Sequence, residues 1–274
     1  MNKDKKVAII TGAAGGIGRA TALRFAREDY RLLLSDIDES GLQSLSADLV
    51  SDGMSVDDFV LFPGDLMDLT YAQSMVKECV SRWNAIDVLV NNAIWRSHET
   101  MRSMAIDRWE KTIKIGLTVP AFLSKWVAEV MESEGRKGVI VNISSVMSVK
   151  AGGTSPAYTV CKGGIESLTF ELASLYGRSG IRVVAIAPGN VLTSLSDDFV
   201  SEDGENLSGK MEASMADQTP LKRSGQSSEI ANAIYWVSSP EASFVSGTVI
   251  QVDGGYSHGF NRNSLKNLQF PNQF

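Results

Sequence analysis

The sequence predicts a single α/β domain built on a doubly wound parallel sheet with helices on both faces. Two observations carry this prediction. Short apolar runs alternate with longer amphipathic stretches along the chain, and a glycine-rich turn follows the first apolar run. Strands joined through helices lie parallel, and the helices then cover both faces of the sheet. A chain of 274 residues is long enough to form one such domain with a large core.

The apolar runs predict the strands, and the amphipathic stretches predict the helices. The expected strands are the apolar runs at 7–10, 31–35, 58–63, 88–91, 139–143, 182–187 and 248–252. The expected helices are the amphipathic stretches at 17–28, 39–51, 69–83, 107–132, 156–178 and 227–238. Two segments depart from the alternation: 193–218, rich in Ser, Asp, Glu and Met, and the tail at 256–274. Both are expected to be additions to the domain, placed to cover a site.

Composition excludes several classes of function. The net charge of -6 comes without long basic runs, so neither a nucleic acid nor an anionic membrane surface is an expected partner. Cys79 and Cys161 have no disulfide or metal spacing, and His98 and His258 stand apart, so no metal is expected. Residues 1–6 lead directly into a short strand and resemble neither a signal peptide nor a membrane span, which favours a cytoplasmic location.

The turn after the first strand reads Thr11-Gly12-Ala13-Ala14-Gly15-Gly16-Ile17-Gly18. Glycines at a strand-to-helix turn let backbone N–H groups approach a pyrophosphate at the positive end of the helix. Many such turns use glycine for structure alone. The position after the first strand favours dinucleotide binding.

The second strand ends near Asp36, eighteen residues beyond Gly18. A carboxylate at this place can accept hydrogen bonds from an adenosine ribose and would repel a 2'-phosphate, which favours NAD over NADP. The alternative is that Asp36, or Asp38 beside it, only caps the next helix.

Tyr158 and Lys162 stand four residues apart, one turn along the expected helix at 156–178. A phenol becomes a useful acid or base near neutral pH when its phenolate is stabilised by about 4 kcal/mol. One ammonium about 4 Å away supplies about that much at an effective dielectric constant near 20. Such a pair also arises by chance on solvated helix faces, so the neighbouring motifs decide its meaning.

Taken together, the motifs over residues 5–256 resemble the short-chain dehydrogenase/reductase family, whose fold is the Rossmann fold. The resemblance rests on the glycine turn, Asp65-Leu66, Asn91-Asn92-Ala93, Tyr158 with Lys162, Ser145 thirteen residues before Tyr158, Pro188-Gly189, and Asp253-Gly254-Gly255. It implies that NAD is bound by Thr11, Gly12, Gly16, Ile17, Gly18, Asp36, Asp65, Leu66, Asn92, Ala93, Tyr158, Lys162, Pro188, Gly189, Val191 and Thr193.

The same resemblance implies an oxidoreductase that interconverts a secondary alcohol and a ketone. Tyr158 would be the acid/base, Lys162 its electrostatic support, and Ser145 the donor to the substrate oxygen; Ser144 is the neighbour with which Ser145 could be confused. Two alternatives are an NAD-binding sensor that has lost turnover and an NAD-dependent epimerase or dehydratase. Related proteins commonly form homotetramers through the helices corresponding to 107–132 and 156–178, so a homotetramer is expected, with a dimer second.

The chain departs from the family pattern at two positions. Gly116 stands where an asparagine usually completes a catalytic tetrad, and Ile94 stands where Asn-Asn-Ala is usually followed by glycine. We hypothesise that water replaces the missing side chain at Gly116, so that a proton relay survives. Ile94 would crowd the cofactor site or line the substrate pocket. The expected pocket residues are Ser145, Tyr158, Ile94, Trp95, Met147, Asn190 and the segment 195–215. Such a lining suits a ring or a medium-sized alcohol about as well as an acyl chain.

Overall fold

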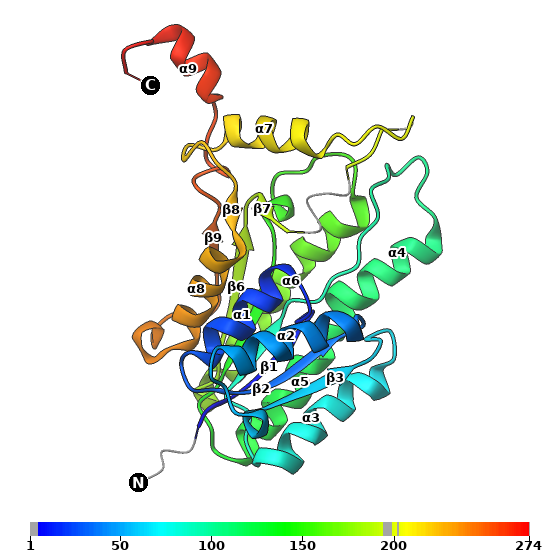
Figure 1. Ribbon diagram of the computed structural model, residues 1–274, viewed down its shortest axis with the longest axis vertical. Coiled ribbons are helices and arrows are strands. Elements are labelled where there is room, and N and C mark those ends of the chain that lie inside the picture. The colour runs from blue at the N-terminus through cyan, green and yellow to red at the C-terminus, as the bar shows by residue number, and fades with distance from the viewer. Residues whose placement is uncertain (1–4, 194–198, 202, 274) are drawn as a thin grey trace.

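The computed structural model describes residues 5–193, 199–201 and 203–273, and the predicted doubly wound α/β architecture is confirmed (Figure 1). In the described part of the chain the central sheet has seven strands in the order β3-β2-β1-β4-β5-β6-β9, all parallel. The strands are β1 (Val7–Thr11), β2 (Arg31–Asp36), β3 (Phe59–Pro63), β4 (Val88–Asn91), β5 (Val139–Ile143), β6 (Arg182–Pro188) and β9 (Thr248–Val252). A second, two-stranded sheet pairs β7 (Val191–Leu192) with β8 (Gly225–Gln226).

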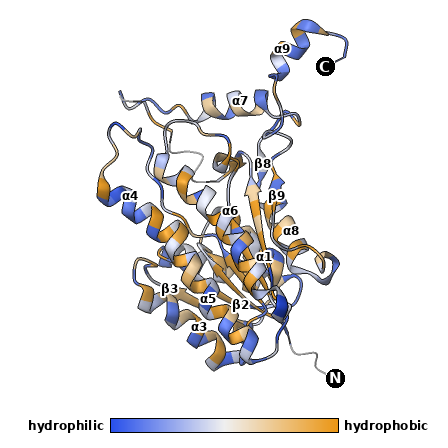
Figure 2. Cartoon of the chain, turned by 180° about the vertical axis from the view of Figure 1, so that it is seen from behind, coloured by the Kyte–Doolittle hydropathy of each residue, from blue (hydrophilic) through white to orange (hydrophobic). Residues whose placement is uncertain are grey.

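Helices cover both faces of the sheet. They are α1 (Gly16–Ala26), α2 (Glu39–Ser51), α3 (Leu69–Trp83), α4 (Ile106–Ile113), α5 (Val119–Ser133), α6 (Pro156–Tyr176), α7 (Ser208–Gln218), α8 (Ser227–Ser238) and α9 (Asn263–Gln269). Figure 2 shows strands that are largely hydrophobic beside helices of mixed hydropathy. One core cluster joins the sheet to α1, α2 and α8, for example through Phe25, Leu45 and Ile234. The other joins it to α3, α5 and α6, through residues such as Met75 and Val127.

The strand order places a crevice at the carboxyl ends of β1 and β4. The chain winds outward from β1 through β2 to β3, and then crosses to β4 on the other side of β1. The loops after β1 and β4 therefore separate toward opposite faces, and open α/β sheets bind ligands at this switch point. Register brings the two loops level, since Ile10 pairs with Val90 immediately before Thr11 and Asn91.

The helix expected at 107–132 is interrupted by one turn of π-helix at Lys114–Thr118, which separates α4 from α5. Gly116 lies in this turn, and its neighbour Ile115 is buried. Single π-turns inside helices often occur at functional sites because the extra residue shifts the facing side chains.

Two of the helices were not expected from the sequence. α7 lies within the segment 193–218, and α9 lies beyond it, at the opposite end of the molecule from the N-terminus (Figure 1). The start of α9 is tied to α7 by polar contacts: Asn263 Nδ2 donates to the Thr219 carbonyl over 2.8 Å, and Ser264 Oγ donates to Asp217 over 2.7 Å. Phe260 and Leu268 of the tail are strongly exposed.

Two features are absent from the described residues. None of their helices is long and apolar enough to cross a membrane. No group of three or more His, Cys, Asp or Glu side chains among them converges into a cluster that could hold a metal ion.

Candidate active site

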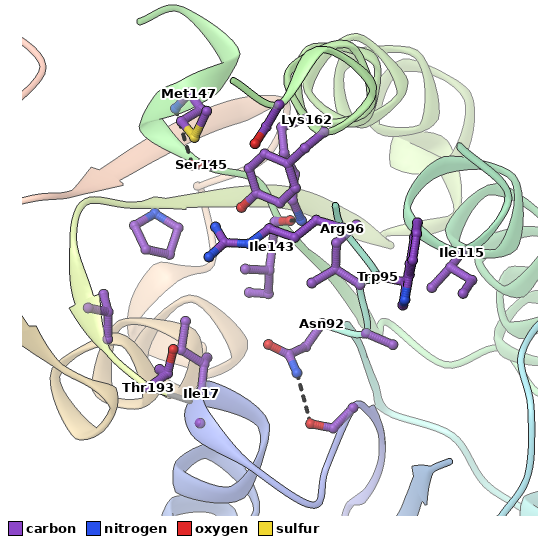
Figure 3. A pocket seen from close by; sticks show the side chains of 18 of the residues that line it. Ile17, Asn92, Trp95, Arg96, Ile115, Ile143, Ser145, Met147, Lys162 and Thr193 are labelled. Carbon is purple, nitrogen blue, oxygen red and sulfur yellow. Dashed lines mark hydrogen bonds between the residues drawn. The ribbon is translucent and has the colours of Figure 1, made fainter. Parts of the chain in front are cut away.

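A cavity of about 640 Å³ opens at the carboxyl ends of the parallel strands (Figure 3). The loops after β1, β2, β3, β4, β5 and β6 line it, together with Tyr158 and Lys162 of α6 and with Met211 and Met215 of α7. The structure therefore brings the glycine turn, the strand-end motifs and the Tyr/Lys pair into one space. That space is large enough for a cofactor and a small substrate together.

The glycine turn needs its glycines for close approach and for backbone conformation. Gly12 and Gly16 have positive φ angles of 66° and 52°, a region that costs other residues conformational energy. A Cβ on Gly12 would lie 2.8 Å from Nδ2 of Asn92, and one on Gly18 would overlap the carbonyl oxygen of Gly12. Gly18 does not itself line the cavity, so its contribution is to let α1 start this close to the loop.

Thr11 and Asn92 join the loops on either side of the switch point. Oγ1 of Thr11 accepts hydrogen bonds from the backbone N–H groups of Asn92 and Ala93, over 3.0 and 3.1 Å. Nδ2 of Asn92 donates to the carbonyls of Thr11 and Gly12, each over 3.0 Å. Thr11 is buried behind the cavity wall rather than part of it. It therefore supports the loop, whereas Asn92 and Ala93 face the cavity.

The first turn of α1 is open to an anion. Its N-cap residue, Gly15, provides no side-chain cap, and no acidic residue lies in the first turn. A Cβ on Gly15 would meet nothing within 4 Å, so the approach to these N–H groups is unobstructed. The first N–H groups of a helix have no partner within the helix, and together with the helix dipole they favour a phosphate.

Asp36 and Asp38 have different roles in the structure. Asp38 is the N-cap of α2, accepting from the N–H of Gly41 over 3.0 Å and from Ser40 Oγ over 2.7 Å. The hydrogen bond from Ser40, followed by that from Gly41, lowers the pKa of Asp38. Asp36 instead ends β2, lines the cavity, and accepts from the N–H groups of Ala14 and Asp38 over 2.9 and 3.0 Å. The helix cap is thus Asp38, and Asp36 faces the cavity at the end where Asp65 and Leu66 also lie.

Tyr158 and Lys162 lie one turn apart on α6, as their spacing predicts. The Lys162 ammonium lies 5.4 Å from the centroid of the Tyr158 ring. Lys162 is only 3% exposed, and its Nζ donates to the carbonyl of Ile143 at the end of β5. This bond holds a buried cation beside the phenol, and burial strengthens its electrostatic effect.

Ser145 is the second residue after β5 and faces the same cavity. Its Oγ accepts from the N–H of Met147 over 3.1 Å, and none of the described groups accepts its proton. Ser144 differs, because its Oγ donates to Oε1 of Glu166 over 2.7 Å. Ser148 donates to the same oxygen over 2.6 Å. Ser144 is therefore held by Glu166, whereas Ser145 keeps a proton for a ligand oxygen.

Ile94 and Gly116, the two departures from the family pattern, contact each other. A Cβ on Gly116 would overlap Cδ1 of Ile94 and Sγ of Cys161, so these side chains fill the volume next to Gly116. Burial raises the pKa of the Cys161 thiol, which therefore packs there in its neutral form. The volume beside the Cα of Gly116 is therefore filled by packing, and the survival of a proton relay through water stays a prediction. Ile94 also lines the cavity.

The segment after β6 closes the cavity from the other side. Pro188, Gly189, Asn190, Val191 and Thr193 all line it. The Cγ2 methyl of Thr193 would lie 3.1 Å from a Cβ on Gly16, so Thr193 sits against the glycine turn.

Beyond Thr193, the expected pocket segment 195–215 is only partly described. Residues 195–198 and 202 lie outside the described residues. Met211 and Met215 do reach the cavity.

Sequence reasoning missed several side chains at the cavity end near Tyr158. Arg96 places its guanidinium carbon 5.8 Å from the centroids of both the Tyr158 and the Phe199 rings. Lys150 lies with Nζ 3.8 Å from the centroid of the Tyr256 ring. For Arg96 the available signal was its place in the segment 94–98, which directly follows Asn-Asn-Ala at the end of β4.

The fold and the site define a dinucleotide-binding α/β protein, and comparison with known proteins identifies the family. Residues 12–257 match the family model described as enoyl-(acyl carrier protein) reductase. The chain is 33% identical to a 3-oxoacyl-[acyl-carrier-protein] reductase of Thermotoga maritima, covering 93% of this chain and 99% of that protein. It is 32% identical to a cis-4-hydroxycyclohexanecarboxylate dehydrogenase of Sinomonas cyclohexanicum, covering 92% and 97%.

A solved structure agrees. A short-chain dehydrogenase/reductase described as glucose/ribitol dehydrogenase, from Brucella melitensis, superposes with a TM-score of 0.83 at 30% identity, over 93% of this chain and 99% of that one. The chain therefore belongs to the short-chain dehydrogenase/reductase family, as its motifs suggested. It is an oxidoreductase of this family, whose members bind NAD or NADP.

Proposed function

We propose that this protein oxidises a secondary alcohol to a ketone, or catalyses the reverse reduction, with NAD as cofactor. The observation that carries the proposal is that Ser145, Tyr158 and Lys162 line the same cavity as the glycine turn and Asp36. Acid/base and cofactor-binding groups therefore share one space. A binding-only sensor would not need the Ser145 hydroxyl, whose proton no described group accepts, in the same cavity as the phenol.

The residues present fit a dinucleotide. The uncapped start of α1 and the positive-φ glycines suit its pyrophosphate, and the Asp36 carboxylate suits the adenosine ribose. A 2'-phosphate would bring negative charge toward Asp36, which is why we favour NAD over NADP. When bound, the nicotinamide supplies the hydride acceptor or donor. Pro188, Gly189, Val191 and Thr193 line the part of the cavity where we place the nicotinamide.

The chemistry of the chain's own residues is proton transfer and orientation. Ser145 donates its hydroxyl proton to the substrate oxygen, which fixes the carbinol carbon in the cavity. In the oxidative direction Tyr158, as a phenolate, takes the proton of the substrate hydroxyl. Lys162 stabilises that phenolate through its adjacent positive charge. In the reductive direction Tyr158 returns the proton to the forming alkoxide.

The test is a screen of sugars, polyols, cyclic alcohols, steroids and 3-oxoacyl thioesters, followed by NADH absorbance. We expect Tyr158→Phe to lower kcat by about 10²- to 10⁴-fold while calorimetric binding of NAD persists. A Tyr158→Phe variant with the kcat of the wild type would refute the acid/base role. A protein that binds no NAD would refute the proposal as a whole.

We further propose a homotetramer assembled through α5 and α6. Exposed apolar side chains on these helices support it, including Phe122, Val160, Phe170 and Leu175. Light scattering coupled to gel filtration measures the assembly directly, and a monomer at micromolar concentration would reject it. The cytoplasmic location stays a prediction, and so does the role of 193–218 and 256–274 as cover for the site.

A further inference from the structure

The charged side chains of the described cavity lining come from different elements according to their sign. The carboxylates are Asp36 at the end of β2, Asp38 shortly beyond it, and Asp65 after β3, at the end where we place the adenosine. Apart from Lys162, the cations are Arg96 after β4, Lys150 after β5 and Lys111 of α4. Of these three, Arg96 lies beside Tyr158.

Arg96 is a second cation, besides Lys162, that lies beside the proposed reaction centre. Figure 3 shows its side chain extending across the middle of the pocket, with Ser145 and Met147 on one side and Ile17 and Thr193 on the other. Its guanidinium carbon is 5.8 Å from the Tyr158 ring centroid. The planar guanidinium presents five donors and matches a carboxylate with two parallel hydrogen bonds.

Lys150 is another cation of the cavity lining. Its Nζ donates to the carbonyl of Tyr256 over 3.1 Å, which uses one of its three N–H groups and leaves the ammonium charge unneutralised. Within the described chain neither Lys150 nor Lys111 forms an ion pair. Lys111 instead lies over the Trp95 ring, 4.6 Å from its centroid.

The cavity also has an apolar and aromatic part, beside polar side chains such as His98 and Asn190. Met147, Met211, Met215, Trp95 and Phe199 line the cavity around the cations. A ligand that satisfies both features has an apolar body and one anionic group.

We propose that the substrate is a hydroxy acid or keto acid whose carboxylate is bound by Arg96, with Lys150 reinforcing the attraction. In such a substrate the carboxylate is a few bonds from the carbon whose oxygen exchanges a proton with Tyr158. This assignment rests on the proposed alcohol dehydrogenase function and names its substrate class. Arg96 fixes which end of the substrate faces the reaction centre. A neutral alcohol of the same shape lacks this anchor.

The experiment compares matched pairs that differ only in charge. With NAD, kcat/KM is measured for 4-hydroxycyclohexanecarboxylate and 4-hydroxycyclohexanecarboxamide, and for 3-hydroxybutyrate and 3-hydroxybutyramide. We expect kcat/KM for the better acid to exceed kcat/KM for its amide by about 10- to 100-fold, the range for one charge-assisted contact. Arg96→Gln is expected to bring this ratio close to one, and Lys150→Gln to lower it by a smaller factor. Arg102→Gln is the matched control, because Arg102 is exposed on the same loop and outside the cavity.

A binding arm keeps the inference testable when none of these alcohols reacts. Cyclohexanecarboxylate and cyclohexanecarboxamide are titrated into the NAD-loaded protein by calorimetry. Tighter binding of the acid, lost in Arg96→Gln but kept in Arg102→Gln, supports the assignment. Equal or tighter binding of the amide overturns the assignment. Amides that the wild type turns over at least as well as the acids also overturn it, but the dehydrogenase function would then stand. Absence of NAD binding would separately remove the dehydrogenase function.

Discussion

The Cδ1 methyl of Ile94 occupies the space into which a side chain on Gly116 would extend. The chain thus carries a large residue where its family usually has glycine, directly against a glycine where the family usually has asparagine. Exchanges that conserve total volume are the ones a packed interior tolerates best. The two departures are therefore one coupled change of packing, which the sequence shows only as two separate positions.

Gly116→Asn alone is expected to destabilise the protein by about 1–3 kcal/mol and to lower kcat, because it inserts a side chain into filled space. The variant Ile94→Gly/Gly116→Asn is expected to recover part of both losses. Urea unfolding and steady-state kinetics of the two single variants and the double variant form a double-mutant cycle. Additive effects would contradict the coupling. A large gain in turnover from Gly116→Asn alone would show that the wild-type proton path is incomplete.

The fold could be predicted because apolar runs mark its strands and amphipathic stretches mark most of its helices. The strands at Val88–Asn91 and Val139–Ile143 and the helices at Glu39–Ser51 and Leu69–Trp83 match their expected bounds. α7 was missed because none of its residues is buried, so it lacks the apolar stripe by which a helix is recognised. The π-turn at Lys114–Thr118 was missed because hydrophobic spacing does not report one extra residue in a turn.

The site could be predicted where its residues lie at or just beyond strand ends. Asp36, Asn92 and Ser145 are examples, since topology alone places the ends of parallel strands at one edge. Arg96 and Lys150 could not be found in this way. Their approach to the cavity depends on the path of loops that carry no motif.

Glu166 is expected to be a positioning residue for Ser145. Its Oε1 accepts from Ser144 and Ser148, which lie on either side of Ser145 along the chain. Glu166→Leu should lower the free energy of unfolding by about 1–3 kcal/mol, because the hydroxyls of Ser144 and Ser148 lose a charged acceptor and keep only backbone carbonyls. It should lower kcat about tenfold or more, with a smaller change in KM for NAD. Glu166→Gln keeps an acceptor oxygen and should recover most of the rate. A loss of stability with unchanged kcat would show that Glu166 does not position Ser145.

Asp36→Asn is expected to weaken discrimination against NADP. The substitution removes the charge that faces the cavity while keeping the shape and one acceptor oxygen. We expect KM for NAD to rise about tenfold, as a charge-assisted hydrogen bond is lost, and KM for NADP to fall. Kinetics with both cofactors measure the ratio. Asp38→Asn is the comparison, since asparagine caps a helix as well as aspartate does. A wild-type protein that already prefers NADP would contradict the role given to Asp36.

Arg223 and Glu229 should make stability depend on pH at the start of α8. Arg223 donates two hydrogen bonds to the Glu229 carboxylate, each 2.7 Å long, and the N–H of Gln226 donates a third over 2.9 Å. The bonds from Arg223, and then that from Gln226, lower the pKa of Glu229 to about 2. Because this pKa lies below that of an unfolded glutamate, about 4.3, the ionised pair stabilises the fold above that pH.

The contribution is lost as the pH falls from about 4.3 toward 2, where Glu229 takes up its proton. Arg223→Gln is therefore expected to lower the free energy of unfolding by a small amount at pH 7, and by progressively less below pH about 4.3. The effect stays small because both side chains are exposed to solvent and salt. Urea titrations of wild type and variant between pH 7 and pH 2 measure the difference. A difference that stays constant over this range would mean that Arg223 stabilises the loop by packing and not by its charge.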